Sequence, residues 1–269
     1  MNLRSLMGAT MFAFAIAIAA STAMMSTGPA RAEALDDIAA AKVVKIAVPQ
    51  DFAPFGSAGT DLKPQGYDID MANLIGRELG AKVEIIPVTS ANRIPYLQTR
   101  KADLVISTLG KNPEREKVID FTSAYAPFFQ AVYAPKSMKL TTFAEMAGKT
   151  VAVTRGAMED QELNKVAPPN VDYRRFEDNN ATIAAFVAGQ TQTIATSAAV
   201  AGDMLAKNPK VSAEFKLLLK DSPCFVGVVK GETALKTKVN EIIAAAKKDG
   251  TLDAMAKKWL GKAAGDLPV

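Results

Sequence analysis

The sequence predicts an α/β fold, because apolar runs typical of buried strands alternate with segments whose apolar residues recur at helical spacing. Residues 43–48 form the first predicted strand, and residues 104–106 lie in another, fully apolar one. Between them, segment 66–80 places apolar residues three and four positions apart and ends in glycine, which predicts a helix with a marked stop. Further strands are expected at residues 82–88, 131–134, 150–153 and 225–229, and further helices at 176–189, 235–246 and 251–260.

Composition narrows the classes of function. The chain has 269 residues, 49% of them hydrophobic and 22% charged, which suits a globular protein of one or two domains. It has no histidine, which excludes a Ser-His-Asp or Cys-His apparatus and the usual zinc sites, so we expect no metal and no cofactor. The single cysteine, Cys224, is expected to be a small buried residue. The net charge of +4 comes from scattered basic residues, and no nucleic-acid partner is expected.

Residues 1–32 have the pattern of a secretory signal peptide. Arg4 supplies the positive start, residues 11–20 form an apolar core, and the small residues at 30–32 fit a cleavage site. The mature chain should begin near Glu33 and lie free in the periplasm, because no cysteine stands at the cleavage point to carry a lipid anchor. Retention of this segment as a membrane anchor is the alternative.

Segment 107–121 predicts a binding site for a carboxylate. Asn112 is a favourable N-cap residue and is followed by proline, so a helix should begin here. Arg115 then projects from the first helical turn, where backbone N–H groups have no partner within the helix. A guanidinium, free amides and the Thr108 hydroxyl together suit a planar carboxylate. The alternative is a surface ion pair between Arg115 and either Glu116 or Asp120.

The same segment resembles the carboxylate-binding stretch of the family-3 periplasmic solute-binding proteins, the polar amino-acid receptors of ABC importers. Gly110 stands where a second hydroxyl residue is usual, and it can still offer a backbone N–H. By this resemblance Thr108, Leu109, Gly110 and Arg115 are expected to line the site. The residues that fall on the family pattern are Asp103, Thr108, Arg115, Phe121 and Tyr125.

The resemblance extends over nearly the whole mature chain. A G-Y-D-x-D motif at 66–70, whose acids are expected to cap the helix, and a D-G-T…K-W-x-G ending at 249–261 are both similar to family motifs. The resemblance implies an α/β, two-lobe periplasmic binding protein fold of type II, in which each lobe is a β-sheet flanked by helices and two segments form the hinge.

The resemblance also implies the division of the chain. The first lobe should be discontinuous, comprising residues 33–127 and 223–269, and the second lobe should comprise residues 128–222. The crossing segments are expected near 126–131 and 221–225.

Two further parts of the first lobe are implied to meet the ligand. Asp51 and Phe52 lie in the loop after the first strand, at the carboxyl end where open α/β sheets bind ligands. Phe52 matches the aromatic that stacks on the ligand in the family, whereas a place in the core is the alternative. Arg93 replaces a frequent leucine of the family pattern, and the polar pair of Asn92 and Arg93 suggests a polar or acidic ligand side chain. The alternative for this pair is a solvated first helical turn.

The second lobe is implied to hold the other side of the ligand. Residues Arg155, Gly156, Ala157 and Met158 form a turn that opens a helix, and its free amides could hold a carboxylate. Arg155 could face the cleft or solvent.

Ser197 stands where relatives have the aspartate that holds the ligand ammonium. If the ligand keeps an α-ammonium, another acid must balance it, and Asp51 is the candidate. If it does not, the ligand is an acid or a modified amino acid, which Arg93 and Arg155 would favour. A shift of register in this part of the comparison is the other possibility.

The function implied is the substrate-binding component of an ABC importer. It would capture an amino acid or related small carboxylate between the lobes and deliver it to an inner-membrane permease. The protein is expected to be a monomer and not an enzyme. A cofactor-free lyase of the cyclohexadienyl dehydratase type is the alternative, since some relatives use a cleft acid as a proton donor. A sensor module is a third class, and the chain lacks the transmembrane and kinase extension that is its usual sign.

Overall fold

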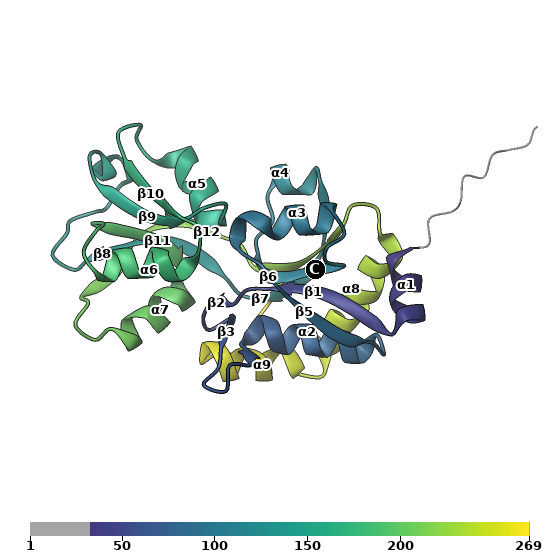
Figure 1. Cartoon of the computed structure of the whole chain (residues 1–269). Helices are drawn as coiled ribbons and strands as arrows, with labels where there is room; N and C mark the ends of the chain where they lie inside the picture. The colour runs from purple at the N-terminus through teal and green to yellow at the C-terminus, as the bar shows by residue number, and fades with distance from the viewer. Residues whose placement is uncertain (1–32, 269) are drawn as a thin grey trace, which may run out of the picture. The chain divides into compact units, whose positions relative to one another are not determined.

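The computed structural model describes residues 33–268, so the predicted signal peptide lies outside the described part. Within that part the chain forms two five-stranded sheets and one small three-stranded sheet, with helices packed on the two larger sheets (Figure 1). No helix in residues 33–268 combines the length and apolar character needed to cross a membrane.

The first sheet has the strand order β5-β1-β6-β13-β7. Strands β1, β5 and β6 run parallel, whereas β13 runs antiparallel to both of its neighbours. Every residue of β6 is buried, as its apolar run predicts. The strands are β1 (Val43–Val48), β5 (Lys82–Pro87), β6 (Leu104–Leu109), β7 (Ile119–Ala126) and β13 (Cys224–Val229).

Helices cover both faces of this sheet. One face packs with α1, α2, α8 and α9 in a single apolar cluster, and the other packs with α3 (Figure 1). The apolar residues predicted to mark α8 are all buried, which confirms the amphipathic helix. The helices of this lobe are α1 (Ala34–Ala41), α2 (Tyr67–Glu78), η1 (Ser90–Asn92), α3 (Arg93–Gln98), α4 (Pro113–Glu116), α8 (Thr233–Lys248) and α9 (Thr251–Leu260).

The second sheet has the order β10-β9-β11-β8-β12. Helix α5 packs on one face with Val132 and Val153, and α6 and α7 pack on the other with Ala131 and Ile194. The strands are β8 (Phe129–Pro135), β9 (Thr150–Thr154), β10 (Asp172–Phe176), β11 (Thr193–Ser197) and β12 (Ala213–Asp221). The helices are η2 (Phe143–Met146), α5 (Met158–Val166), α6 (Asn179–Val187) and α7 (Ala198–Lys207).

The chain crosses between the two sheets twice. It leaves β7 at Ala126 and enters β8 at Phe129, then returns between Asp221 and Cys224. The Ser222 N–H donates to the Phe128 carbonyl oxygen at 3.1 Å, so the two crossings are hydrogen-bonded to each other. Each sheet with its helices is one lobe of the predicted α/β architecture. The residue-by-residue limits of the lobes remain a prediction.

Some elements were not anticipated from the sequence. The loop after β1 forms a small sheet of β2 (Asp51–Phe52), β3 (Gly56–Ala58) and β4 (Pro64–Gln65), whose strands are too short to show a pattern. The helix expected from residue 176 begins at Asn179, because residue 176 closes β10 and the Asp178 side chain accepts from the Ala181 N–H as an N-cap.

The burial of α8 gives a test of the fold. Ile243 is 2% exposed in the main apolar cluster, so Ile243→Ala should lower the free energy of unfolding by about 2–4 kcal/mol through lost burial and a cavity. Urea unfolding followed by circular dichroism measures this change. Glu241→Ala on the exposed side of the same helix is the control and should change stability little. Equal losses in both variants would contradict the assigned packing.

Candidate functional site

Thr108, at the end of β6, has an unusual backbone conformation. Its φ of +42° lies in the left-handed region, which a β-branched residue rarely adopts. The backbone N–H of Thr108 donates to Asp68 Oδ2 at 2.8 Å, and the Tyr125 hydroxyl donates to Asp68 Oδ1 at 2.6 Å. All three residues are buried. A carboxylate from α2 therefore holds the strained turn from which the rest of the site extends.

Asp68 was expected to cap α2, and that expectation is wrong. No side chain caps this helix; the Asp68 carboxylate turns inward to Thr108, and the Asp70 carboxylate accepts from Trp259 Nε1 and Lys258 Nζ. Burial raises the pKa of Asp68 to about 7, although the hydrogen bonds from Tyr125 and Thr108 and the charge of Arg93 oppose the rise.

Arg93 begins α3 and is 4% exposed. Its Nε donates to Ser107 Oγ at 3.0 Å, and one terminal nitrogen donates to Thr108 Oγ1 at 3.3 Å. Burial lowers the pKa of Arg93, opposed by the charges of Glu159, Asp51 and Asp68. The structure thus excludes a solvated turn for Arg93 and places its guanidinium beside the Thr108 hydroxyl.

Arg115 lies in the first turn of α4, where Asn112 Oδ1 accepts from the Arg115 N–H at 2.9 Å as the predicted N-cap. The side chain is buried and is not a surface ion pair. Its two terminal nitrogens donate to the carbonyl oxygens of Gly110, at 2.8 Å, and Gly156, at 3.1 Å. Its Nε has no hydrogen-bond partner in residues 33–268. Burial and the neighbouring Arg93 lower its pKa to about 10.

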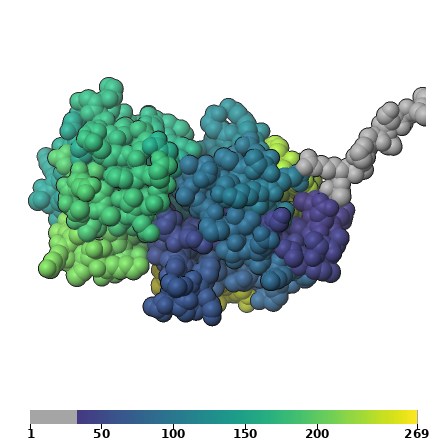
Figure 2. Space-filling view, in the orientation of Figure 1, coloured from purple at the N-terminus to yellow at the C-terminus, as the bar shows by residue number. Residues whose placement is uncertain are grey.

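Hydrogen bonds near Arg115 join the two lobes. Gly156 is on the second lobe, in the turn before α5, and its carbonyl accepts from Arg115 of the first. Asn112 Nδ2 donates to Gln161 Oε1 of α5 at 2.7 Å. A Cβ on Gly156 would lie 2.9 Å from Ala91 Cα, and Gly156 has φ of +72°, so only glycine fits this approach without adjustment. The two lobes lie against each other on the face drawn in Figure 2.

A second inter-lobe contact lies at the loop after β1. The Asp51 carboxylate accepts from the N–H of Asn179, and Asn179 Nδ2 donates to the Asp51 carbonyl at 2.9 Å. Asp51 therefore binds the N-terminal turn of α6. Phe52 is buried and contacts the rings of Phe55 and Phe128, with centroids 6.3 Å away in each case.

The second sheet carries polar side chains at the end where β11 stops and β8 begins. Ser197 ends β11 and is fully buried, and its Oγ accepts from the Val200 N–H as the N-cap of α7. Gln130 pairs with Ser197 across β8 and β11. Val132 of β8 packs in the α5 cluster, so strand alternation places Gln130 on the α5 face as well.

Several buried side-chain atoms in residues 33–268 have no hydrogen-bond partner. Such atoms are uncommon in folded proteins, because burying an unpaired polar group costs free energy. Glu159, in the first turn of α5, is the single carboxylate among them, and sequence analysis did not select it. The atoms are Arg115 Nε, Gln130 Nε2, Gln130 Oε1, Glu159 Oε1, Thr191 Oγ1 and Thr196 Oγ1.

Other predicted site residues lie in varied surroundings. The Arg155 side chain is 49% exposed and pairs with Glu177, so it faces solvent. Asn92 is exposed and donates to Thr89 Oγ1 at 2.9 Å. The Leu109 side chain packs in the apolar cluster around α3, while Ala157 and Met158 are buried at the start of α5. Binding by each predicted residue remains a prediction.

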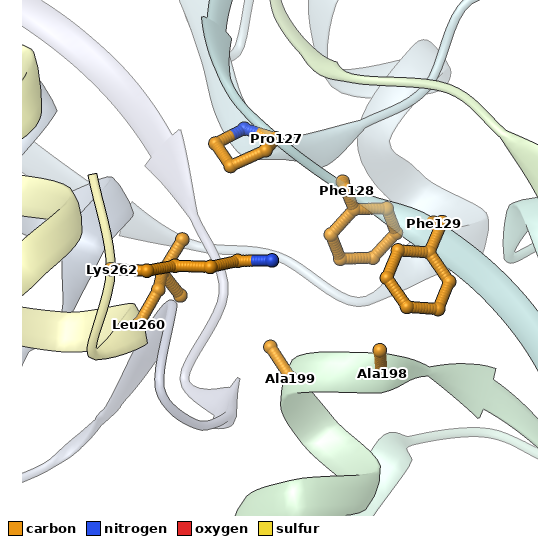
Figure 3. Close-up of a pocket in the computed structure, with 7 residues that line it drawn as sticks. All are labelled: Pro127, Phe128, Phe129, Ala198, Ala199, Leu260 and Lys262. Atoms are coloured by element: carbon orange, nitrogen blue, oxygen red, sulfur yellow. The ribbon is translucent and has the colours of Figure 1, made fainter. Parts of the chain in front are cut away.

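A pocket of about 230 Å³ lies beside the first crossing segment, away from the arginines (Figure 3). The Lys262 side chain extends into it toward Phe128 and Phe129. Its lining includes none of the residues predicted to bind ligand. In the part of the chain that the structure describes, no group of three or more His, Cys, Asp or Glu is arranged to hold a metal ion.

The chain is similar in sequence to amino-acid-binding proteins of ABC transporters. A glutamine-binding protein of an ABC transporter from Bacillus subtilis (strain 168) is 29% identical over 200 residues, covering 73% of this chain and 72% of that protein. The ABC transporter arginine-binding protein 1 of Escherichia coli (strain K12) is 27% identical over 231 residues, covering 82% of this chain and 91% of that protein.

A solved structure extends the likeness to three dimensions. An ancestral amino-acid-binding protein, described as a precursor of cyclohexadienyl dehydratase, superposes with a TM-score of 0.77 at 31% identity, covering 84% of this chain and 99% of that chain. It is itself named a binding protein, so the lyase alternative is not favoured. The two-lobe fold predicted from the sequence is confirmed.

The family assignment rests on a match that covers most of the chain. The model of the bacterial extracellular solute-binding proteins, family 3, matches residues 44–262, which include both sheets and both arginines of the site. The predicted family is thereby confirmed. The protein belongs to the family-3 bacterial extracellular solute-binding proteins.

Proposed function

We propose that the protein is the substrate-binding component of an ABC importer and captures an amino acid or related small carboxylate between its lobes. The observation that carries the ligand site is Arg115, a buried guanidinium whose Nε has no partner among residues 33–268 and whose other nitrogens reach both lobes. A buried cation of this kind needs an anion, and a ligand carboxylate supplies one. The Thr108 hydroxyl and the amides at Gly110 and before α5 are the further donors.

Arg93 extends the proposal to the rest of the ligand. Its guanidinium is buried near that of Arg115, and the mutual repulsion contributes to the lowered pKa of Arg115. Two buried arginines favour a ligand that has a second anionic or strongly hydrogen-bond-accepting group. The named relatives bind glutamine and arginine, so family membership leaves this end of the ligand open.

Export and delivery complete the proposed function. The first 32 residues would direct secretion and be removed near Glu33, leaving the protein free in the periplasm without a lipid anchor. The lobes would comprise residues 33–127 with 223–269, and residues 128–222. A ligand that contacts both lobes stabilises their contact by its differential affinity, and the closed surface is then presented to the permease.

Loss of Arg115 should abolish tight binding. Arg115→Ala should weaken binding of the best amino-acid ligand by about 3–5 kcal/mol, since the ligand carboxylate would lose its charged partner. Arg115→Lys should restore binding only in part, because lysine lacks the planar fork. Isothermal titration calorimetry measures both, with circular dichroism to verify folding. Unchanged affinity in Arg115→Ala would contradict the proposed site.

Arg93 should discriminate among ligands by charge. Arg93→Met should weaken L-glutamate by about 2–5 kcal/mol and L-glutamine by less, because only the first carries a second carboxylate. Arg155→Met is the matched control, since Arg155 is half exposed in its pair with Glu177. An equal effect of both substitutions on glutamate would place Arg155 at the ligand, and no effect of Arg93→Met would remove Arg93 from the site.

The close approach at Gly156 should be needed for binding. Gly156→Ala should reduce ligand affinity, because its Cβ would collide with Ala91 of the other lobe. Gly148→Ala is the control, because Gly148 has a similar φ of +70° in the same lobe and no atom within 4 Å of a Cβ. Calorimetry gives the affinities, and small-angle scattering reports whether ligand still reduces the radius of gyration. Equal losses in both variants would indicate backbone strain alone.

A further inference from the structure

We propose that the carboxylate of Glu159, with the amide of Gln130, forms the subsite for the ligand nitrogen, in place of the aspartate that the family pattern has at position 197. The subsite would accept hydrogen bonds from an α-ammonium group. This inference rests on the proposed function and specifies which part of the ligand the second lobe binds.

Glu159 is poised to receive a donor. It is 4% exposed, lies in the first turn of α5, and its Oε1 has no hydrogen-bond partner in residues 33–268. Leaving a buried acceptor unpaired costs free energy, and more so for a charged group. A ligand N–H would remove that cost.

The other acids near the site are already engaged. Asp51, the acid first considered for this role, accepts from the Asn179 N–H. Asp68 accepts from Thr108 and Tyr125, and Asp160 accepts from the Gly156 N–H and pairs with Arg175. Among the acids of residues 33–268, Glu159 is thus the one with a buried carboxylate oxygen that has no hydrogen-bond partner.

The hydrogen bonding of Ser197 and Gln130 also supports a subsite in the second lobe. The Ser197 hydroxyl accepts from Val200, which ties it to α7. Its cross-strand partner Gln130 is fully buried on the α5 face, and neither its amide oxygen nor its amide nitrogen has a partner in the described part of the chain. A carboxamide with a free oxygen beside the N-terminal half of α5 can share a ligand ammonium with Glu159 and leave its own NH₂ for a ligand oxygen.

The charges of the cluster agree with a nitrogen-bearing ligand. Arg93 and Arg115 both feel the Glu159 charge, which opposes the lowering of their pKa values. Arg93, Arg115 and Glu159 alone sum to a net charge of +1. The charges of Asp51 and Asp68, which also act on Arg93, belong to carboxylates that are already hydrogen-bonded. A ligand with two anionic groups and one ammonium complements the two arginines and Glu159 group by group, whereas a purely anionic ligand would bring a carboxylate toward Glu159.

Titration of Glu159 predicts the direction in which ligand affinity changes with pH. Burial raises its pKa to about 6, opposed by Arg93 and Arg115 and assisted by Asp160, and the Glu159 charge also acts on Tyr133 and Cys224. An ammonium binds the ionised carboxylate, so amino-acid affinity should rise between pH 5 and pH 7. A deaminated acid is disfavoured by the ionised form, so its affinity should fall over the same range. Asp68 also titrates here, and Glu159→Gln removes only the Glu159 part.

The test compares the binding of an amino acid with that of the same acid without its amino group. The common L-amino acids, together with succinate and glutarate, are screened by thermal shift on the mature wild-type chain. The strongest amino acid and its deaminated acid are then titrated by calorimetry into wild type, Glu159→Gln and the surface control Glu241→Gln. We expect Glu159→Gln to weaken the amino acid about tenfold or more, to leave the deaminated acid equal or tighter, and to remove the part of the pH dependence that Glu159 causes.

Each outcome decides something. Equal losses for both ligands in Glu159→Gln, or no loss for the amino acid, would overturn the nitrogen subsite while leaving the proposed function intact. Binding of succinate or glutarate with no amino acid bound would do the same. If nothing in the screen binds wild type, the proposed function fails first. The wild-type pH profiles, which need no variant to fold, oppose the inference if the amino acid and its deaminated acid change in the same direction.

Discussion

The buried carboxylate of Asp68 is the constraint on which the site depends. It accepts the N–H of Thr108 and the hydroxyl of Tyr125, and Tyr67 in turn donates to the Tyr125 carbonyl at 2.8 Å. A threonine with positive φ stores about 1–3 kcal/mol of strain and persists only where its surroundings hold it. The strain fixes the direction of the Thr108 hydroxyl, which orients Arg93, and it sets the path of the chain into the α4 cap that presents Arg115.

The site is an arrangement of buried charges that the folded chain only partly compensates. Arg93 has two hydroxyl partners and no carboxylate bonded to it, and Arg115 donates to two carbonyl oxygens. Dipoles of this kind stabilise a cation less than a hydrogen-bonded anion does. The remaining demand for negative charge is the basis of the carboxylate affinity that we propose for this site. The fold supplies the stability needed to hold these groups in place through its two apolar sheets.

Local features could be predicted from the sequence, whereas contacts between residues far apart in the chain could not. The Asn112 cap, the buried strand at residues 104–106 and the apolar face of α8 follow from the local sequence alone, and the structure has all of them. The partner of Asp68 lies 40 residues away, so a rule based on neighbours assigned it to a cap. Glu159 and Arg155 sit four positions apart in one turn, yet one is buried and the other half exposed. Between them lies Gly156, where the second lobe approaches Ala91 and Arg115 of the first, and such an approach cannot be read from neighbours in the sequence.

The position of β13 has a consequence for how the protein assembles. This strand lies between β6 and β7, although it follows the whole second sheet in the sequence. The second sheet is one continuous stretch of chain, from Phe129 to Asp221, and can form as soon as that stretch exists. The first sheet lacks an interior strand until Val229 has been made, and its pairing of distant segments is intrinsically slow. The lobe that begins the chain is therefore the lobe that finishes folding last.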